Sequence, residues 1–288
     1  MLHITQDIER RERNMIMKTI VFLNNKGGVG KTASTTTIVH MMATKFKKKV
    51  LLIDLDPQMN SSMMFSKIDF VSIFKSVYLG KRDFAEKGIE KLFKDDNADI
   101  HDCIMHTSYE NLDIIPSCLT LSEAEEAMKA QVVVPQQFKL RNQLEKIKDE
   151  YDYCIIDTSP SVSIININGL NAADELYIPI RCDGGSLLGV GIIMNLFNTV
   201  KSFNPDLKIG GMFFTQWNGR KNVSKTVYAL LEQFFGDYII PVSISTSKDM
   251  EECTLTQEPL LEYSPNSKVS KEYLRLTEYI LNNNKTTA

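Results

Sequence analysis

The sequence predicts an α/β fold: a doubly wound, mostly parallel sheet of about seven or eight strands flanked by helices. Short runs rich in β-branched and aromatic residues alternate along the chain with longer segments of helical pattern. The first run leads into a glycine-rich turn and then into a helix start, which is the order of a strand–loop–helix unit. A chain of 288 residues with 43% hydrophobic residues also suffices for one large core.

Seven apolar runs carry the strand pattern, and turn residues or helical segments bound each of them. They span residues 18–24, 49–56, 112–117, 151–159, 175–180, 208–217 and 237–244. Five segments have the periodicity of helices, at residues 32–46, 120–148, 186–202, 222–235 and 267–284. Residues 60–110 are less regular, and we expect short helices there on the rim of the sheet.

The domain organisation is expected to be simple. We assign residues 1–16 to a short charged N-terminal arm and residues 17–288 to a single domain, because no low-complexity linker divides the chain. The arm lacks the apolar segment of a signal peptide, and no stretch approaches the roughly 20 apolar residues of a membrane span. The five cysteines form no C-x-x-C pair, which indicates neither a disulfide framework nor a zinc site. We therefore expect a cytoplasmic protein without a membrane partner.

The segment "NNKGGVGKTAST", residues 24–35, has the composition of a phosphate-binding loop between a strand and a helix. Its glycines allow backbone N–H groups to converge on phosphate oxygens, and the following helix adds its dipole. We expect Lys31 to neutralise the β- and γ-phosphates of ATP, and the Thr32 hydroxyl to ligate Mg²⁺. The nucleotide-contacting residues are predicted to be Lys26, Gly27, Gly28, Val29, Gly30, Lys31, Thr32 and Ala33.

Three aspartates lie toward the ends of two of the predicted strands, where open α/β sheets bind their ligands. Asp54 and Asp56 lie in "LLIDLDPQ", and residues two apart on a strand point to the same side. Asp157 ends the apolar run "YDYCIID", which has the form of a Walker B strand, and we expect it to hold Mg²⁺ through a water. Asp54 is predicted to support the same metal.

The loop departs from the G-x-x-x-x-G-K-[ST] pattern, because Asn25 occupies the position of the first glycine. Its form K-G-G-x-G-K-T resembles the deviant Walker A box of the family that includes the ParA/Soj partition ATPases, MinD and the nitrogenase iron protein. The resemblance implies that Lys26 reaches the nucleotide of a second subunit, and that Asp56, in the "DxDPQ" box, orients the attacking water. Lys26, Lys31 and Asp56 are thus the predicted catalytic residues; a solvated surface lysine is the alternative for Lys26.

The resemblance extends over residues 17–283, up to a Pro-x-x-x-Tyr-x-Pro-x-Ser ending at residues 259–267. Asp183 stands where these proteins usually have a glutamate, and Ser161 where they have a second proline. By position, Asn218 and the loop after Pro241 are candidates for the adenine pocket, although Asn before Gly is also an ordinary turn.

The implied function is partition of a plasmid or chromosome by an ATP-dependent homodimer. In such proteins the ATP dimer binds non-specific double-stranded DNA, which associates it with the nucleoid, and a ParB-type centromere-binding partner triggers hydrolysis. A net charge of −3 requires any DNA site to be a local basic patch. The candidates are Arg220, Lys221, Lys225, Lys248, Lys268, Lys271 and Arg275. The family's arginines after the Ile-Pro pair are replaced by serines and one lysine, and solvated charge is the alternative for each candidate.

Other members of the superfamily remain alternatives. A MinD-like membrane switch would need an amphipathic C-terminal helix, whereas this chain ends in "NNNKTTA". An iron–sulfur reductase would need bridging cysteines, and Cys154 lies inside a strand, where a core role is expected. A tyrosine autokinase would need a Tyr-rich tail. A positioning ATPase that binds no DNA and a metabolic ATP-dependent enzyme are both compatible with the sequence.

Overall fold

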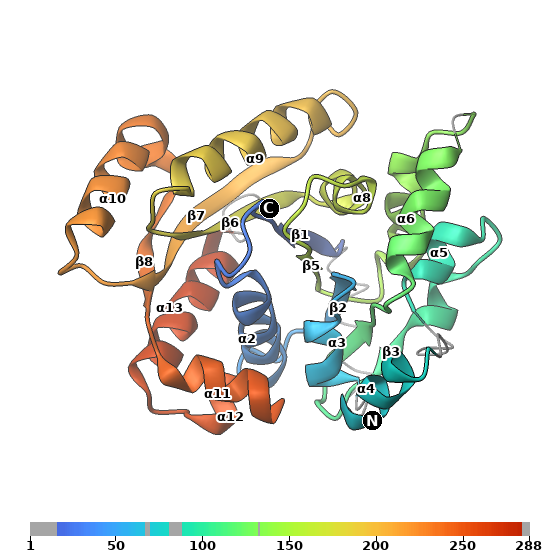
Figure 1. Ribbon diagram of the computed structural model, residues 1–288, viewed down its shortest axis with the longest axis horizontal. Helices are drawn as coiled ribbons and strands as arrows, with labels where there is room; N and C mark the ends of the chain where they lie inside the picture. Colours follow the sequence, from blue (N-terminus) through green and yellow to red (C-terminus); the bar gives the residue numbers. More distant parts are fainter. Residues whose placement is uncertain (1–15, 67–69, 81–87, 132, 284–288) are drawn as a thin grey trace.

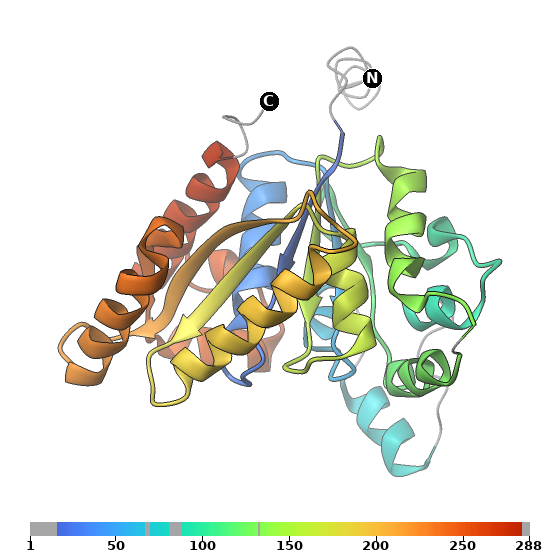
Figure 2. The same cartoon turned by 90° about the horizontal axis from the view of Figure 1, so that it is seen from above.

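The computed structural model describes residues 16–66, 70–80, 88–131 and 133–283, which build an eight-stranded sheet in the order β3-β4-β2-β5-β1-β6-β7-β8. The strands are β1 (Lys18–Phe22), β2 (Val50–Leu55), β3 (Met105–His106), β4 (Leu112–Ile115), β5 (Tyr153–Thr158), β6 (Glu175–Arg181), β7 (Lys208–Trp217) and β8 (Ile239–Ser245). All neighbouring pairs are parallel except β3–β4. The predicted fold class is confirmed (Figures 1 and 2).

All seven predicted strands are present, and β3 is an addition. This strand has two residues and pairs antiparallel with β4 at the end of the sheet. A strand of two residues is too short to show an alternation of apolar and polar residues in the sequence. It is therefore recognised only by its pairing with β4.

Helices cover both faces of the sheet. They are α2 (Lys31–Thr44), α3 (Asn60–Phe65), α4 (Phe70–Tyr78), α5 (Glu90–Lys94), α6 (Leu121–Ala130), α7 (Lys139–Leu144), α8 (Ile164–Ala172), α9 (Ser186–Val200), α10 (Asn222–Phe235), α11 (Lys248–Thr256), α12 (Leu260–Tyr263) and α13 (Lys268–Asn283). The short α3, α4 and α5 fulfil the expectation for residues 60–110.

The core has two layers because successive strand side chains point to opposite faces. In β1, Val21 joins one buried cluster with α8, α9 and α10, whereas Ile20 and Phe22 join the other with α2 and α13. Central strands buried on both sides explain why the predicted strands read as continuous apolar runs.

One predicted helix, residues 120–148, is wrong as a continuous element. Helix α6 ends at Ala130, and Gln131 is extended. A 3-10 turn at Gln136–Phe138 and the short α7 follow. The valines at 133 and 134 disfavour a helix, and Pro135 cannot donate a helical hydrogen bond. The amphipathic pattern on either side of this break favours one long helix in the sequence alone.

Helix α8 was not expected, because its sequence "IININGLNA" is rich in poor helix formers. Its N-cap Ser163 accepts a hydrogen bond from the backbone N–H of Asn166. Asn168 is buried and donates from Nδ2 to the Gln136 carbonyl at 3.0 Å. Tertiary hydrogen bonds thus stabilise a helix that local propensity does not favour.

The predicted N-terminal arm lies outside the described residues, apart from Ile16. Within the described ranges, no helix is both long and apolar enough to cross a membrane.

Candidate nucleotide site

The phosphate loop connects β1 to α2 at the carboxyl end of the sheet. Gly28 and Gly30 have φ angles of +68° and +80°, a region that glycine adopts without strain. A Cβ added at Gly30 would meet the Thr215 side chain at 3.5 Å. No side chain caps the start of α2, and its first turn carries no acid. The N–H groups of this helix start are therefore available to an anion.

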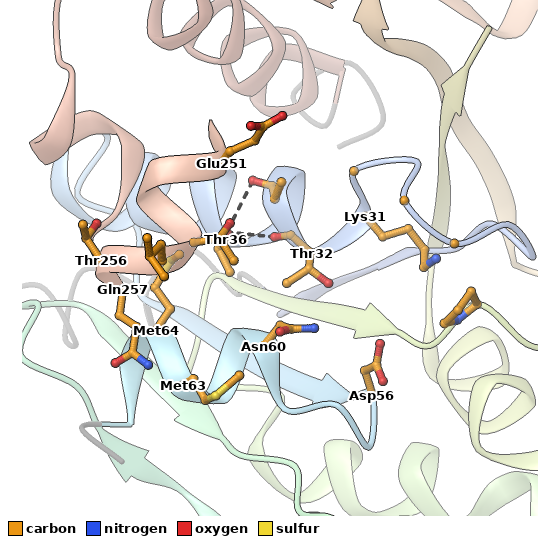
Figure 3. A pocket seen from close by; sticks show the side chains of 17 residues that line it. Lys31, Thr32, Thr36, Asp56, Asn60, Met63, Met64, Glu251, Thr256 and Gln257 are labelled. Atoms are coloured by element: carbon orange, nitrogen blue, oxygen red, sulfur yellow. Dashed lines mark hydrogen bonds between the residues drawn. The ribbon is translucent and has the colours of Figure 1, made fainter. Parts of the chain in front are cut away.

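A cavity of about 770 Å³ opens beside the loop (Figure 3). On one side it is lined by the loop and the start of α2, and on the other by Asp56 and Asn60. A second cavity of about 260 Å³ lies between the loop and the ends of β7 and β8. Together the two spaces have the size expected for a small-molecule ligand.

Lys31 is buried, with 6% of its surface exposed, and its Nζ donates to the Lys26 carbonyl at 3.2 Å. Burial lowers the pKa of Lys31, and the nearby carboxylates of Asp157 and Asp56 oppose this effect. No carboxylate of the described residues forms an ion pair with Lys31. A desolvated ammonium without a direct counter-ion is suited to bind a phosphate.

Asp157, on β5, faces the start of α2. The Ser61 hydroxyl donates to its Oδ2 at 2.6 Å, and the Thr35 hydroxyl lies 3.4 Å from its Oδ1. Burial raises the pKa of Asp157, while hydrogen bonds from Ser61 and Thr32 oppose the shift. The structure thus brings Thr32 and Asp157 together. Thr32 is the predicted direct ligand of Mg²⁺, and Asp157 is predicted to hold the metal through a water.

Asp54 and Asp56 occupy different environments although they are two residues apart. Asp56 lines the large cavity, whereas Asp54 is fully buried and pairs in register with Asp157 on the adjacent strand. Asp54 accepts hydrogen bonds from the N–H of Asp56 at 3.0 Å, and from the N–H and hydroxyl of Ser62 at 2.9 and 2.7 Å. It therefore anchors α3 to β2, and its predicted role at the metal remains a prediction.

Lys26 lies at the mouth of the loop and forms an ion pair with Asp183, which follows β6. Arg181 Nε donates to the same carboxylate at 2.9 Å. Partial burial raises the pKa of Asp183, but the hydrogen bonds from Lys26 and Arg181 prevail and hold it well below its usual range. Lys26 therefore has a defined partner on its own subunit, a contact that sequence analysis did not predict.

Of the adenine candidates, Asn218 and Pro241 themselves line neither cavity, whereas residues of the segment after Pro241 line the smaller one. Asn218 is exposed and accepts a hydrogen bond from the Arg220 N–H in a turn, and Pro241 is exposed on β8. The strand-end residues that line the smaller cavity are Thr215, Gln216, Ile244, Ser245, Thr246 and Ser247. The rule that ligands bind at the carboxyl ends of strands indicates these positions, but β8 continues four residues beyond Pro241.

The seven predicted DNA-contacting residues are all exposed. They come from the turn before α10, from α10 itself, and from α11 and α13, three helices that gather around β8 (Figure 1). The Nζ atom of Lys268 lies 3.5 Å from Oε1 of Glu272. The Glu272 carboxylate also accepts hydrogen bonds from the N–H and the hydroxyl of Ser245. The structure allows these residues to contact a polyanion, but acidic side chains also occupy the start of α11.

Comparisons with known proteins agree with this geometry. A family model described as an AAA domain matches residues 17–209. The sporulation initiation inhibitor protein Soj of Bacillus subtilis is 32% identical over 267 residues, which cover 92% of this chain and 99% of that protein.

Solved structures share the fold. A plasmid partition protein from Borrelia burgdorferi bound to AMPPNP has a TM-score of 0.74 at 25% identity, covering 93% of this chain and 99% of that one. Cobyrinic acid a,c-diamide synthase of Mycobacterium smegmatis, solved with an ATP analog and magnesium, has a TM-score of 0.71 at 23% identity and covers 95% and 98%. With the phosphate loop, the strand-end aspartates and the Soj match over nearly the whole chain, this protein belongs to the ParA/Soj family of partition ATPases.

Proposed function

We propose that this protein is an ATP-dependent dimerising switch for plasmid or chromosome partition. It binds non-specific DNA in its ATP state, and a ParB-type partner stimulates hydrolysis and release. The observation that carries the proposal is the pair of lysines at the loop: Lys31 is buried and lines the large cavity, whereas Lys26 is partly exposed and lines neither cavity. In this proposal Lys31 serves the nucleotide of its own subunit, and Lys26 serves that of a partner.

The residues at the loop fit ATP with Mg²⁺. Left-handed Gly28 and Gly30 leave open the space that a Cβ would enter, and Lys31 lacks a carboxylate partner among the described residues. Thr32 and Asp157 would hold the metal, which neutralises phosphate charge when bound. The relatives solved with an ATP analog support this assignment.

In the proposed mechanism, Asp56 orients the water that attacks the γ-phosphate, since its carboxylate lines the same cavity as Lys31, whereas Glu251, the other acid that lines it, comes from α11 (Figure 3). A cation supplied by the partner's Lys26 stabilises the charge that develops on the transferred group. Slow ATP hydrolysis in the absence of a partner is expected, because the dimer must stay in its ATP state to remain bound to DNA.

The dimer has a direct test. Lys26→Ala should abolish ATP-dependent dimerisation, measured by sedimentation with a non-hydrolysable ATP analog, and should reduce turnover. Lys201→Ala, which replaces the C-cap residue of α9 outside both cavities, is the matched control. Unchanged dimerisation and turnover in the Lys26 variant would remove the basis for action in trans.

DNA binding is tested with the Asp56→Ala protein, which should accumulate in its ATP state. We expect it to bind duplex DNA of arbitrary sequence with ATP but not with ADP, and to lose affinity steeply as salt rises. Substituting Lys268, Lys271 and Arg275 by alanine should weaken binding and reduce the salt dependence. Equal binding with ATP and ADP would show that the nucleotide does not control the DNA surface.

A second candidate is a positioning ATPase that dimerises with ATP but binds no DNA. The observation in its favour is that acids follow Lys248 directly on α11: Asp249, which is partly buried, and the exposed Glu251 and Glu252. Their negative charge repels a polyanion from this part of α11, where Lys248 is the one predicted DNA-contacting residue. Dimerisation with ATP and no DNA binding at low salt would select this candidate.

A further inference from the structure

One carboxylate at the mouth of the phosphate loop holds two cations. Asp183 Oδ1 pairs with Lys26 Nζ, and Asp183 Oδ2 accepts from Arg181 Nε at 2.9 Å. The backbone fixes the carboxylate further, because the Gly185 N–H donates to Oδ1 at 3.1 Å. Asp183 is thus held in place independently of Lys26, and the flexible partner in the pair is the lysine.

Arg181 also contacts the loop itself. Its Nη1 lies 3.5 Å from the Gly28 carbonyl oxygen, and it is the nearest atom, at 3.6 Å, to the position that a Cβ on Gly28 would take. Within the described residues, the arginine has no carboxylate partner other than Asp183. The contact of Arg181 with Asp183 therefore does not depend on Lys26.

The energetics favour a reversible hold on Lys26. The side chains of Lys26 and Asp183 are 30% and 28% exposed, so water screens their attraction, and pairs of this kind contribute little. If Lys26 leaves, Arg181 still neutralises the carboxylate, and no unpaired charge remains at the loop. Without Arg181, the same departure would leave Asp183 without a cation.

We propose that Asp183 is the positioning residue that holds Lys26 on its own subunit until two subunits close, and that Arg181 makes this hold releasable by neutralising Asp183 when Lys26 leaves. The release half of the inference rests on the proposed function, in which Lys26 acts on the partner's nucleotide. The holding half concerns the single subunit and stands apart from it.

The holding contact is tested by the reactivity of the Lys26 amine. The nucleotide-free protein is treated briefly with an amine-acylating reagent, and modification of Lys26 is quantified by mass spectrometry. Asp183→Asn should accelerate acylation of Lys26 about two- to fivefold, the range expected for loss of a partly exposed ion pair, and Arg181→Gln should slow it. Asp102→Asn, which removes an acid paired with Lys91 away from the loop, should change nothing at Lys26.

Release is tested by the concentration of a non-hydrolysable ATP analog that gives half-maximal dimerisation. Asp183→Asn should lower it about two- to fivefold, Arg181→Gln should raise it by a similar factor, and the double variant should behave like Asp183→Asn. Opposite shifts cannot come from a cluster that only supports the loop, since either substitution would then weaken the site.

The outcomes separate the two proposals. Shifts in the same direction for both single variants, or unchanged Lys26 acylation in Asp183→Asn, would overturn the positioning role. If acylation shifts as expected but the wild-type protein fails to dimerise with ATP, the proposed function and the release step are refuted, whereas the hold on Lys26 is confirmed.

Discussion

The substitution Asp54→Asn should change the pH dependence of folding stability. Asp54 is fully buried, and burial together with repulsion from Asp157 raises its pKa to about 7, against opposing hydrogen bonds from Ser62 and Asp56. Over the range from about pH 4 to about pH 7, the folded chain holds a proton that the unfolded chain has released. The stability contributed by this proton therefore falls as pH rises through that window.

The magnitude follows from the shift. A pKa raised from 3.8 to about 7 is a change of about three units, which corresponds to at most about 4 kcal/mol between the two ends of the window. This is an upper value because Asp157 titrates with Asp54. An asparagine carries no such penalty, but its amide has one acceptor oxygen where the carboxyl has two, so the N–H of either Asp56 or Ser62 loses its acceptor. Leaving that buried donor unpaired costs about 1–3 kcal/mol at every pH.

We therefore expect Asp54→Asn to be less stable than the wild type near pH 5, and to recover by up to about 3 kcal/mol relative to it near pH 8. Urea unfolding of the nucleotide-free protein across this range measures the difference, with the exposed Asp102→Asn as control. If the wild type and Asp54→Asn lose stability with parallel slopes, Asp54 is ionised throughout, and the argument from burial is refuted.

Three further substitutions test the site and its support. Lys31→Met should weaken ATP binding at least about tenfold in a fluorescence titration, because a charge-assisted hydrogen bond contributes about 1.5–3 kcal/mol; unaltered affinity would contradict its role. Gly30→Ala should destabilise the protein by about 1–2 kcal/mol in thermal unfolding, since its φ is +80°, whereas Gly27→Ala, which meets no atom within 4 Å, should cost less. Tyr273→Phe should cost about 1 kcal/mol in urea unfolding by removing the 3.0 Å hydrogen bond to Ser34, and an unchanged midpoint would show that this bond contributes nothing.

Much of the fold could be predicted because it is encoded in short segments. The strands buried on both faces are continuous apolar runs, and α10 begins and ends at the residues expected. The prediction was wrong where local signals conflict with tertiary contacts. Helix α8 depends on hydrogen bonds from its asparagines to distant carbonyls. The break after α6 contains a run of valines, and the amphipathic pattern on either side of it obscures this signal.

The sequence by itself determined the phosphate loop and the order of the strand-end aspartates, because each is a contiguous motif whose chemistry lies in neighbouring residues. Only the tertiary structure decided which charges meet. Asp183 reaches Lys26 across 157 positions, and Asp54 is separated from the cavity that Asp56 lines by the packing of α3 against β2. These outcomes depend on strand order and burial, and no local pattern specifies the side chain that a distant strand end will bring into contact.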